Sequence, residues 1–225
     1  ISNGKGYKGQ WKWRDVAPPA GDLATLDQFA AAVGAYLRRG IEQSYATECR
    51  HLQAQMRWGQ SPLTSCFFHG CIDQARDLTA GTKYNILSCG GIAFANAVDC
   101  VAAIREVVYE KREASLDEVA QACAANFQGY ERLRAKLLAA PKHGNDDARL
   151  EEIIHLVQRL RDVPMKEICR DPRDGTPMGN GHVVRSSAVK QGLVTPATPD
   201  GRLAGTPLAS SVAAAVGCER SGPTA

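Results

Sequence analysis

Several features that mark common protein classes are missing from these 225 residues. The chain has no apolar run long enough to cross a membrane as a helix. Its net charge is only +3 and its basic residues are spread along the chain, so no stretch indicates a nucleic-acid footprint. No methionine precedes Ile1 and no signal segment follows it. We therefore expect no membrane or nucleic-acid partner, and we expect the chain to be an internal segment of a larger protein.

The cysteines also lack a metal-binding or redox pattern. None of the eight makes a C-x-x-C pair. Cys66 and Cys71 lie close in sequence, but no pair of His or Cys nearby completes a tetrahedral set. We interpret the cysteines as reduced thiols of a cytoplasmic protein, mostly buried as small hydrophobic side chains. The sequence therefore predicts no bound metal and no bound cofactor.

Hydrophobic periodicity predicts a helix-rich chain with enough apolar content, 44%, to build a core. Thr25 with Gln28, and Ser115 with Glu118, have the spacing of capping boxes at helix starts. Past Pro172 the sequence predicts loops, with one strand near residues 182–189. The predicted helices cover residues 25–58, 93–112, 115–126, 130–139 and 147–161.

The most specific motif is the run Ala197–Ala209, A-T-P-D-G-R-L-A-G-T-P-L-A. By composition it is typical of a floppy tail, because few large apolar side chains remain to bury. Yet it resembles the A-T-P-D-G-R-x-A-G-x-P-L-A signature of glycyl radical enzymes, the pyruvate formate-lyase superfamily. Further runs resemble that family in the same order, between about Ser61 and Ala225; they are D-C-V-A-A-I-R-E-V-V-Y-E at 99–110, N-F-Q-G-Y-E-R-L-R at 126–134 and P-K-H-G-N-D-D at 141–147. Physically, these runs are typical of helix packing and capping.

The resemblance implies an α/β fold, a helix-rich fragment of a ten-stranded barrel wrapped by helices, with an irregular Gly/Pro-rich C-terminal third. Residues 1–225 would then be one segment of a pyruvate formate-lyase-like domain. Its parts would be a loop plus long helix at 1–60, a helical scaffold at 61–170, and a barrel strand with loops at 171–225.

The resemblance also implies a chemistry. In the family a glycyl radical takes hydrogen from a cysteine, and the thiyl radical then takes hydrogen from substrate, which leads to C–C, C–O or C–N cleavage. It implies an S-adenosylmethionine iron–sulfur activase as partner, a small-molecule substrate and a homodimer. The sequence holds neither an R-V-x-G-Y motif for the radical glycine nor a G-C-V-E tetrad, so we expect the segment alone to be inactive. The alternative is a non-catalytic helical binding or assembly protein that kept the scaffold.

Cys71 and Asp73 have two interpretations. The tetrad G-C-I-D at 70–73 is similar to G-C-V-E, which would make Cys71 the radical cysteine and Asp73 a general acid or base. The surrounding residues instead resemble a family stretch, S-P-L…D-C-I-E, that lies downstream of the catalytic cysteine. On that order we predict no catalytic residue in the chain and a packing role for Cys71.

The substrate wall is predicted from the signature by counting back along the chain. Residues 183–189 fall where the family has an inward-facing strand, and alternation puts His182, Val184 and Ser186 on one face. We predict these three as substrate-binding residues. His182 is either a proton-transfer group or an exposed loop residue, and the sequence leaves both open.

Overall fold

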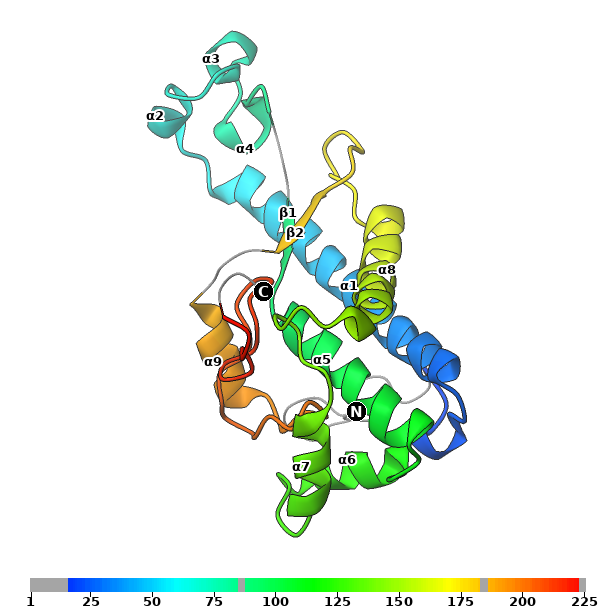
Figure 1. Cartoon of the computed structure of the whole chain (residues 1–225). Coiled ribbons are helices and arrows are strands. Elements are labelled where there is room, and N and C mark those ends of the chain that lie inside the picture. The colour runs from blue at the N-terminus through cyan, green and yellow to red at the C-terminus, as the bar shows by residue number, and fades with distance from the viewer. Residues whose placement is uncertain (1–15, 85–87, 183–185, 223–225) are drawn as a thin grey trace. The chain divides into compact units, whose positions relative to one another are not determined.

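The structure is a computed structural model that describes residues 16–84, 88–182 and 186–222, and most of its ordered elements are helices (Figure 1). The chain divides into two compact units. Unit 1 comprises residues 1–37, 90–161 and 182–225, and unit 2 comprises residues 38–89 and 162–181.

The long helix α1, Leu26–Trp58, has the predicted bounds to within one residue. The predicted capping box is present at its start. The amide of Gln28 donates to Thr25 Oγ1 at 3.2 Å, and the amide of Thr25 donates to Gln28 Oε1 at 3.3 Å. These two bonds satisfy backbone donors that the first turn of a helix leaves without partners.

Unit 1 is built around a helical core. Its helices pack two clusters of buried side chains, one around Val107 and Leu137 and one around Val98 and Ile104. The second capping box is confirmed on one side, since the amide of Glu118 donates to Ser115 Oγ at 3.1 Å. The predicted helices correspond to α5, Phe94–Ile104, with a π-helical extension Arg105–Glu110; α6, Leu116–Ala124; α7, Glu131–Ala139; and α8, Glu151–Ile168.

Unit 2 contains a hairpin of short helices at residues 61–83, which we call the 61–83 hairpin. Asp77 holds it together, because its carboxylate accepts from the amide of Ser61 at 2.7 Å, the hydroxyl of Ser65 at 2.9 Å and the amide of Thr79 at 3.1 Å. These bonds favour the charged carboxylate and lower the pKa of Asp77 to about 2. The elements of the hairpin are α2, Pro62–Ser65, α3, Cys71–Gln74, and α4, Leu78–Gly81.

Two short strands complete the described secondary structure. They are β1, Ser88–Gly91, and β2, Gly179–His182, and they pair as a two-stranded sheet. The strand predicted near residues 182–189 is wrong over 187–189, because these residues begin the helix α9, Ser187–Val194. Residues 183–185 lie outside the described residues.

The packing of α9 explains why the sequence did not predict this helix. Ala188 and Gly192 are four residues apart and are both buried, so they form the packed face of the helix. A Cβ at Gly192 would lie only 2.4 Å from the carbonyl oxygen of Thr206. Glycine is a poor helix former, but here its lack of a side chain permits close packing, and packing overrides propensity.

The end of α8 was also predicted wrongly, at 161 instead of Ile168. The helix continues through Pro164, which lacks the amide that an interior helical residue donates. Pro164 and Met165 are both buried. Their burial compensates for the lost hydrogen bond in a way that the sequence pattern does not reveal.

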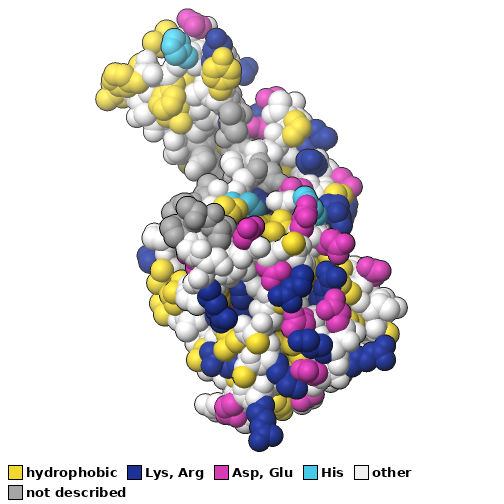
Figure 2. Space-filling model, in the orientation of Figure 1, with side chains coloured by type: hydrophobic (Ala, Val, Ile, Leu, Met, Phe, Trp, Pro, Cys, Tyr) yellow, Lys and Arg dark blue, Asp and Glu magenta, His cyan; other side chains and the backbone are white. Residues whose placement is uncertain are grey.

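The surface over α2–α4 carries large hydrophobic side chains (Figure 2). Leu63, Phe67 and Ile72 are 78%, 82% and 68% exposed. Single exposed apolar residues are ordinary, but three within ten residues of one another make a patch.

Among the described residues, no helix is both long enough and apolar enough to cross a membrane.

Candidate functional site

His182 lies at the end of β2 in unit 1, and two other elements of that unit hold its ring. Arg161 of α8 places Nη1 2.6 Å from His182 Nε2. The ring of Phe94, at the start of α5, has its centroid 4.8 Å from the imidazole centroid. The His182 side chain is half-buried. His182 is therefore not an exposed loop residue, which was one of its two interpretations.

A second histidine extends the ring cluster. His143 packs edge-on against Phe94 with centroids 5.9 Å apart. Its Nε2 lies 2.9 Å from the carbonyl oxygen of Val212, and a carbonyl only accepts, so Nε2 carries the proton. Its backbone amide donates to Asp99 Oδ1 at 2.7 Å. The sequence analysis treated the P-K-H-G run as a capping device and missed this packing, because nothing in the run itself points to Phe94.

The other two predicted substrate-binding residues are placed less fully. Val184 lies outside the described residues. Ser186 is exposed and precedes α9 with helical backbone angles, φ −59° and ψ −17°. The strand alternation that grouped His182 with Ser186 therefore does not reach Ser186. The structure describes His182 in its ring cluster and Ser186 at a helix start.

Behind the ring cluster, unit 1 buries several charged groups. Asp99 is fully buried, and burial raises the pKa of its carboxyl to about 7. Lys142 is also buried, and its ammonium donates to the carbonyls of Leu137 at 2.7 Å and Ala140 at 3.2 Å. Burial lowers the pKa of Lys142, although the nearby carboxylates oppose this. Asp99 and Lys142 come from separate motifs that the sequence assigned to helix packing and capping.

The signature run is ordered by a second buried carboxylate. Asp200 accepts from the side-chain amide of Asn96 at 2.8 Å and from the hydroxyl of Thr198 at 2.5 Å. Asn96 in turn accepts from the amide of Ala209 at 2.7 Å, so α5 clamps both ends of the run. The guanidinium of Arg202 fills the loop that this clamp closes, and it donates to Thr198 Oγ1 and to the carbonyls of Thr195, Pro196, Leu203 and Thr206.

The N-F-x-G-Y-E-x-L-R motif joins the same clamp. Asn126 Oδ1 accepts from the amide of Ala204 at 2.8 Å, and Arg134 Nε donates to the carbonyl of Gly201 at 2.9 Å. Gly201 has φ +89°, and a Cβ there would lie 2.6 Å from Leu138. Motifs separated by about seventy residues in sequence thus form one packed unit around the signature.

Cys71 and Asp73 lie in unit 2, on the four-residue helix α3. The Cys71 side chain is buried, and that burial raises the pKa of its thiol. Asp73 is exposed. Residues two apart on a helix do not share a face, so the carboxylate and the thiol are not presented to one pocket. Among the described residues, no group of three His, Cys, Asp or Glu side chains could hold a metal ion.

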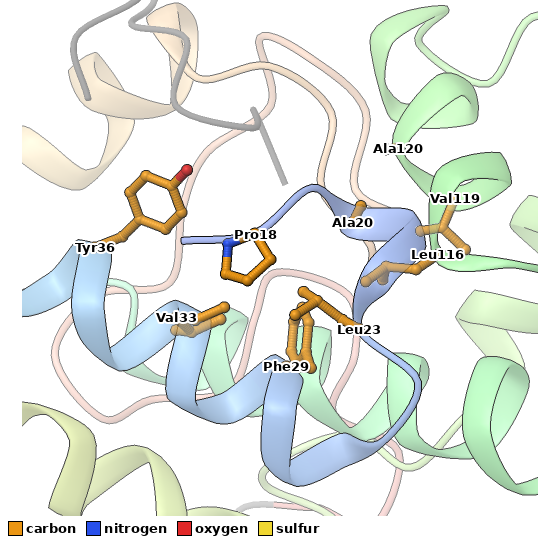
Figure 3. A pocket seen from close by; sticks show the side chains of 10 residues that line it. Pro18, Ala20, Leu23, Phe29, Val33, Tyr36, Leu116, Val119 and Ala120 are labelled. Atoms are coloured by element: carbon orange, nitrogen blue, oxygen red, sulfur yellow. The ribbon is translucent and has the colours of Figure 1, made fainter. Parts of the chain in front are cut away.

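An apolar hollow of about 50 Å³ lies in unit 1 between the start of α1, α6 and the loop before α1 (Figure 3). Its walls are the hydrocarbon side chains of Pro18, Leu23, Phe29, Val33 and their neighbours. Apart from the hydroxyl of Tyr36, the lining side chains carry no group for acid–base chemistry, so this hollow suits packing of an apolar side chain.

Comparison with known proteins identifies the family. Residues 1–177 match the family model PFL-like, described as Pyruvate formate lyase-like. The chain belongs to this pyruvate formate lyase-like family, and its relatives include a probable dehydratase, isethionate sulfite-lyases and a 4-hydroxyphenylacetate decarboxylase glycyl radical subunit.

Two relatives illustrate the similarity of this chain to curated proteins. The Probable dehydratase YbiW of Escherichia coli (strain K12) is 31% identical over 209 residues, which cover 89% of this chain and 25% of that protein. The Isethionate sulfite-lyase of Bilophila wadsworthia is 32% identical over 160 residues, which cover 69% of this chain and 18% of that protein.

Solved structures confirm the predicted fold class. The glycerol dehydratase from Clostridium butyricum superposes with a TM-score of 0.85 and 26% identity over 92% of this chain and 26% of that one. A structure from Roseburia inulinivorans, titled for 1,2-propanediol dehydration, superposes with a TM-score of 0.90 and 27% identity. The match covers 99% of this chain and 29% of that one. The chain has the fold of part of the glycyl radical enzyme barrel, and it spans about a quarter of the length of the relatives it matches.

Proposed function

We propose that this chain supplies scaffold and part of the substrate wall of a glycyl radical enzyme that cleaves a C–C, C–O or C–N bond through a thiyl radical. One observation carries the proposal. The A-T-P-D-G-R signature is not a floppy tail but a loop held by hydrogen bonds with the buried Asn96 and with Asn126 and Arg134. Two other family motifs, at 99–110 and 126–134, supply side chains of the buried cluster against which it packs.

The radical groups themselves do not fit residues of this chain. The sequence has no R-V-x-G-Y motif, and Cys71 is a buried thiol whose helix does not present Asp73 beside it. When present, a glycyl radical supplies hydrogen abstraction from a catalytic cysteine. We therefore propose that a longer polypeptide brings both groups, with an S-adenosylmethionine activase as partner and a homodimeric assembly. The 225-residue chain alone is expected to be inactive.

The residues of this chain bind and orient substrate in this proposal. His182, Ser186 and Val184 form part of the wall. The substrate class follows the relatives, whose names include trans-4-hydroxy-L-proline dehydratase and isethionate sulfite-lyase. We expect a small, hydroxylated molecule, because side chains such as those of His182 and Ser186 can hydrogen-bond hydroxyl groups.

The test uses a longer enzyme that contains residues 1–225, activated anaerobically. His182→Gln and Ser186→Ala should each lower kcat/KM or change the preferred substrate while the glycyl radical signal in electron paramagnetic resonance stays undiminished. Lys190→Ala, on the exposed side of α9, is the matched control and should change neither. Unchanged kinetics in both substrate-wall variants would contradict the proposed wall.

A further inference from the structure

Arg161 is a residue that neither the motifs nor the predicted site singled out. It lies on α8, and its Nη1 is 2.6 Å from His182 Nε2. Both residues belong to unit 1. The contact joins segments 21 residues apart in sequence, so it is not a local pairing within one helix.

The chemistry of this contact fixes the proton on His182. A guanidinium carries N–H donors and no acceptor, and it stays protonated in proteins. The ring nitrogen that it meets must therefore be the acceptor, which leaves a lone pair on Nε2. An imidazole with a lone pair on Nε2 is neutral and has its proton on Nδ1.

The surroundings hold the pair in this geometry. Phe94, which is 6% exposed, packs its ring against the imidazole at 4.8 Å. On the other side β1 passes closely at Gly91, where a Cβ would lie 3.4 Å from both Arg161 Cζ and His182 Nδ1. That distance is ordinary van der Waals contact, so β1 lies directly against the pair at Gly91.

We propose that Arg161 is a positioning residue for the substrate wall. Its guanidinium holds His182 as the neutral Nδ1–H tautomer and occupies Nε2. His182 then orients the wall and does not deliver a proton from Nε2 to substrate. The role of Arg161 in a substrate wall rests on the proposed function. The tautomer of His182 does not, because it follows from contacts within this chain.

The test is nuclear magnetic resonance of the 225-residue chain with ¹⁵N-labelled histidine at pH 8. Long-range ¹H–¹⁵N correlation separates protonated from unprotonated ring nitrogens, and His182→Gln assigns the signals. Wild type should show an unprotonated Nε2 and a protonated Nδ1 for His182. Arg161→Met removes the donor, so the signals should exchange toward the Nε2–H tautomer that neutral histidine favours in water.

Two further variants keep the result interpretable. Arg161→Lys retains a cationic donor and should restore the Nδ1–H tautomer, which simple loss of packing would not do. Arg159→Met changes an exposed arginine two residues away on α8 and should leave the signals unchanged. A wild-type Nε2–H tautomer, or one that Arg161→Met leaves unaltered, overturns the inference. Confirmed tautomers together with unchanged kinetics of His182→Gln in the longer enzyme would overturn the proposed substrate wall alone.

Discussion

The signature run of unit 1 and the 61–83 hairpin of unit 2 are both irregular segments organised by one aspartate. Asp200 accepts hydrogen bonds at the base of the signature loop, and Asp77 accepts them at the centre of the hairpin. Their surroundings differ. Asp200 is 4% exposed and lies against the core of unit 1, whereas the hairpin exposes Leu63, Phe67 and Ile72.

The two loops are therefore both ordered by hydrogen bonds to an aspartate, but they differ in how deeply those bonds are buried. In unit 1 Asp200 and its partner Asn96 are both buried, so the loss of one leaves the other buried without compensation. In the hairpin Ser65 is buried but Asp77 and Thr79 are only half-buried, so water can replace some of their hydrogen bonds. We therefore expect mutations in the signature to destabilise unit 1 as a whole and mutations at Asp77 to act locally.

Asp200→Ala should have the largest effect. It removes the acceptor for Asn96 and Thr198 and leaves the Arg202 guanidinium in a half-buried site without its nearest carboxylate. We expect the free energy of unfolding to fall by about 3–5 kcal/mol, measured by urea denaturation. Asp73→Ala, at an exposed aspartate, is the control and should change it by less than about 0.5 kcal/mol. Equal losses would remove the distinction between the two segments.

Asp99→Asn tests the buried charges of unit 1 through pH. The folded-state pKa of Asp99 is about 7 and its ordinary value is 3.8. The stability linked to this carboxyl is thus fully present below pH 3.8 and is lost as pH rises through 7. Asparagine stays neutral, so the variant should be more stable than wild type at pH 8 by about 2–4 kcal/mol and nearly equal at about pH 3.5. Urea denaturation at both pH values measures this, and a pH-independent difference would count against the raised pKa.

Gly192→Ala should have a smaller effect. The added methyl group meets the Thr206 carbonyl at 2.4 Å, and overpacking of this kind costs about 1–3 kcal/mol. Gly181→Ala is the matched control, because no atom of the described residues beyond its chain neighbours lies within 4 Å of a Cβ there. Thermal denaturation that ranks the two variants equally would show that α9 does not pack on residues 206–208 as closely as described.

Asp77→Asn should have the smallest and most local effect. Hydrogen exchange should accelerate at amides of the 61–83 hairpin and stay unchanged at amides of α5 and α7. In wild type, the pKa of Asp77 is lowered from 3.8 to about 2, so its contribution is present above pH 3.8 and is lost as pH falls through 2. Faster exchange throughout unit 1 would mean that the hairpin is not an independent local structure.

Much of the fold follows from the sequence, and the exceptions have physical reasons. Helices with a strong apolar period and a capping box, such as α1 and α6, were predicted within two residues of their ends. The C-terminal helix α9 was missed because Gly192 lowers helix propensity and only tertiary packing explains it. The predicted α8 ended at 161 because the sequence pattern does not reveal the packing of the buried Pro164 and Met165.

The candidate site was less predictable than the fold. His182 was found by counting from a motif, but its partners Arg161 and Phe94 lie on distant helices and belong to no pattern. Ser186 was grouped with it through a strand alternation that the chain does not keep. For Cys71 the order of the family motifs already predicted a packing role, and its burial on the short helix α3 favours the same role.

The central claim, that this chain is scaffold and substrate wall without the radical groups, is tested most directly by electron paramagnetic resonance. A longer enzyme containing residues 1–225 is activated anaerobically by an S-adenosylmethionine activase, with Cys71→Ser beside wild type and the 225-residue chain as a third sample. The account predicts an equal glycyl radical signal and similar turnover in the first two, and no signal in the third. Loss of turnover in Cys71→Ser with an undiminished signal, or a radical on the 225-residue chain, would contradict it.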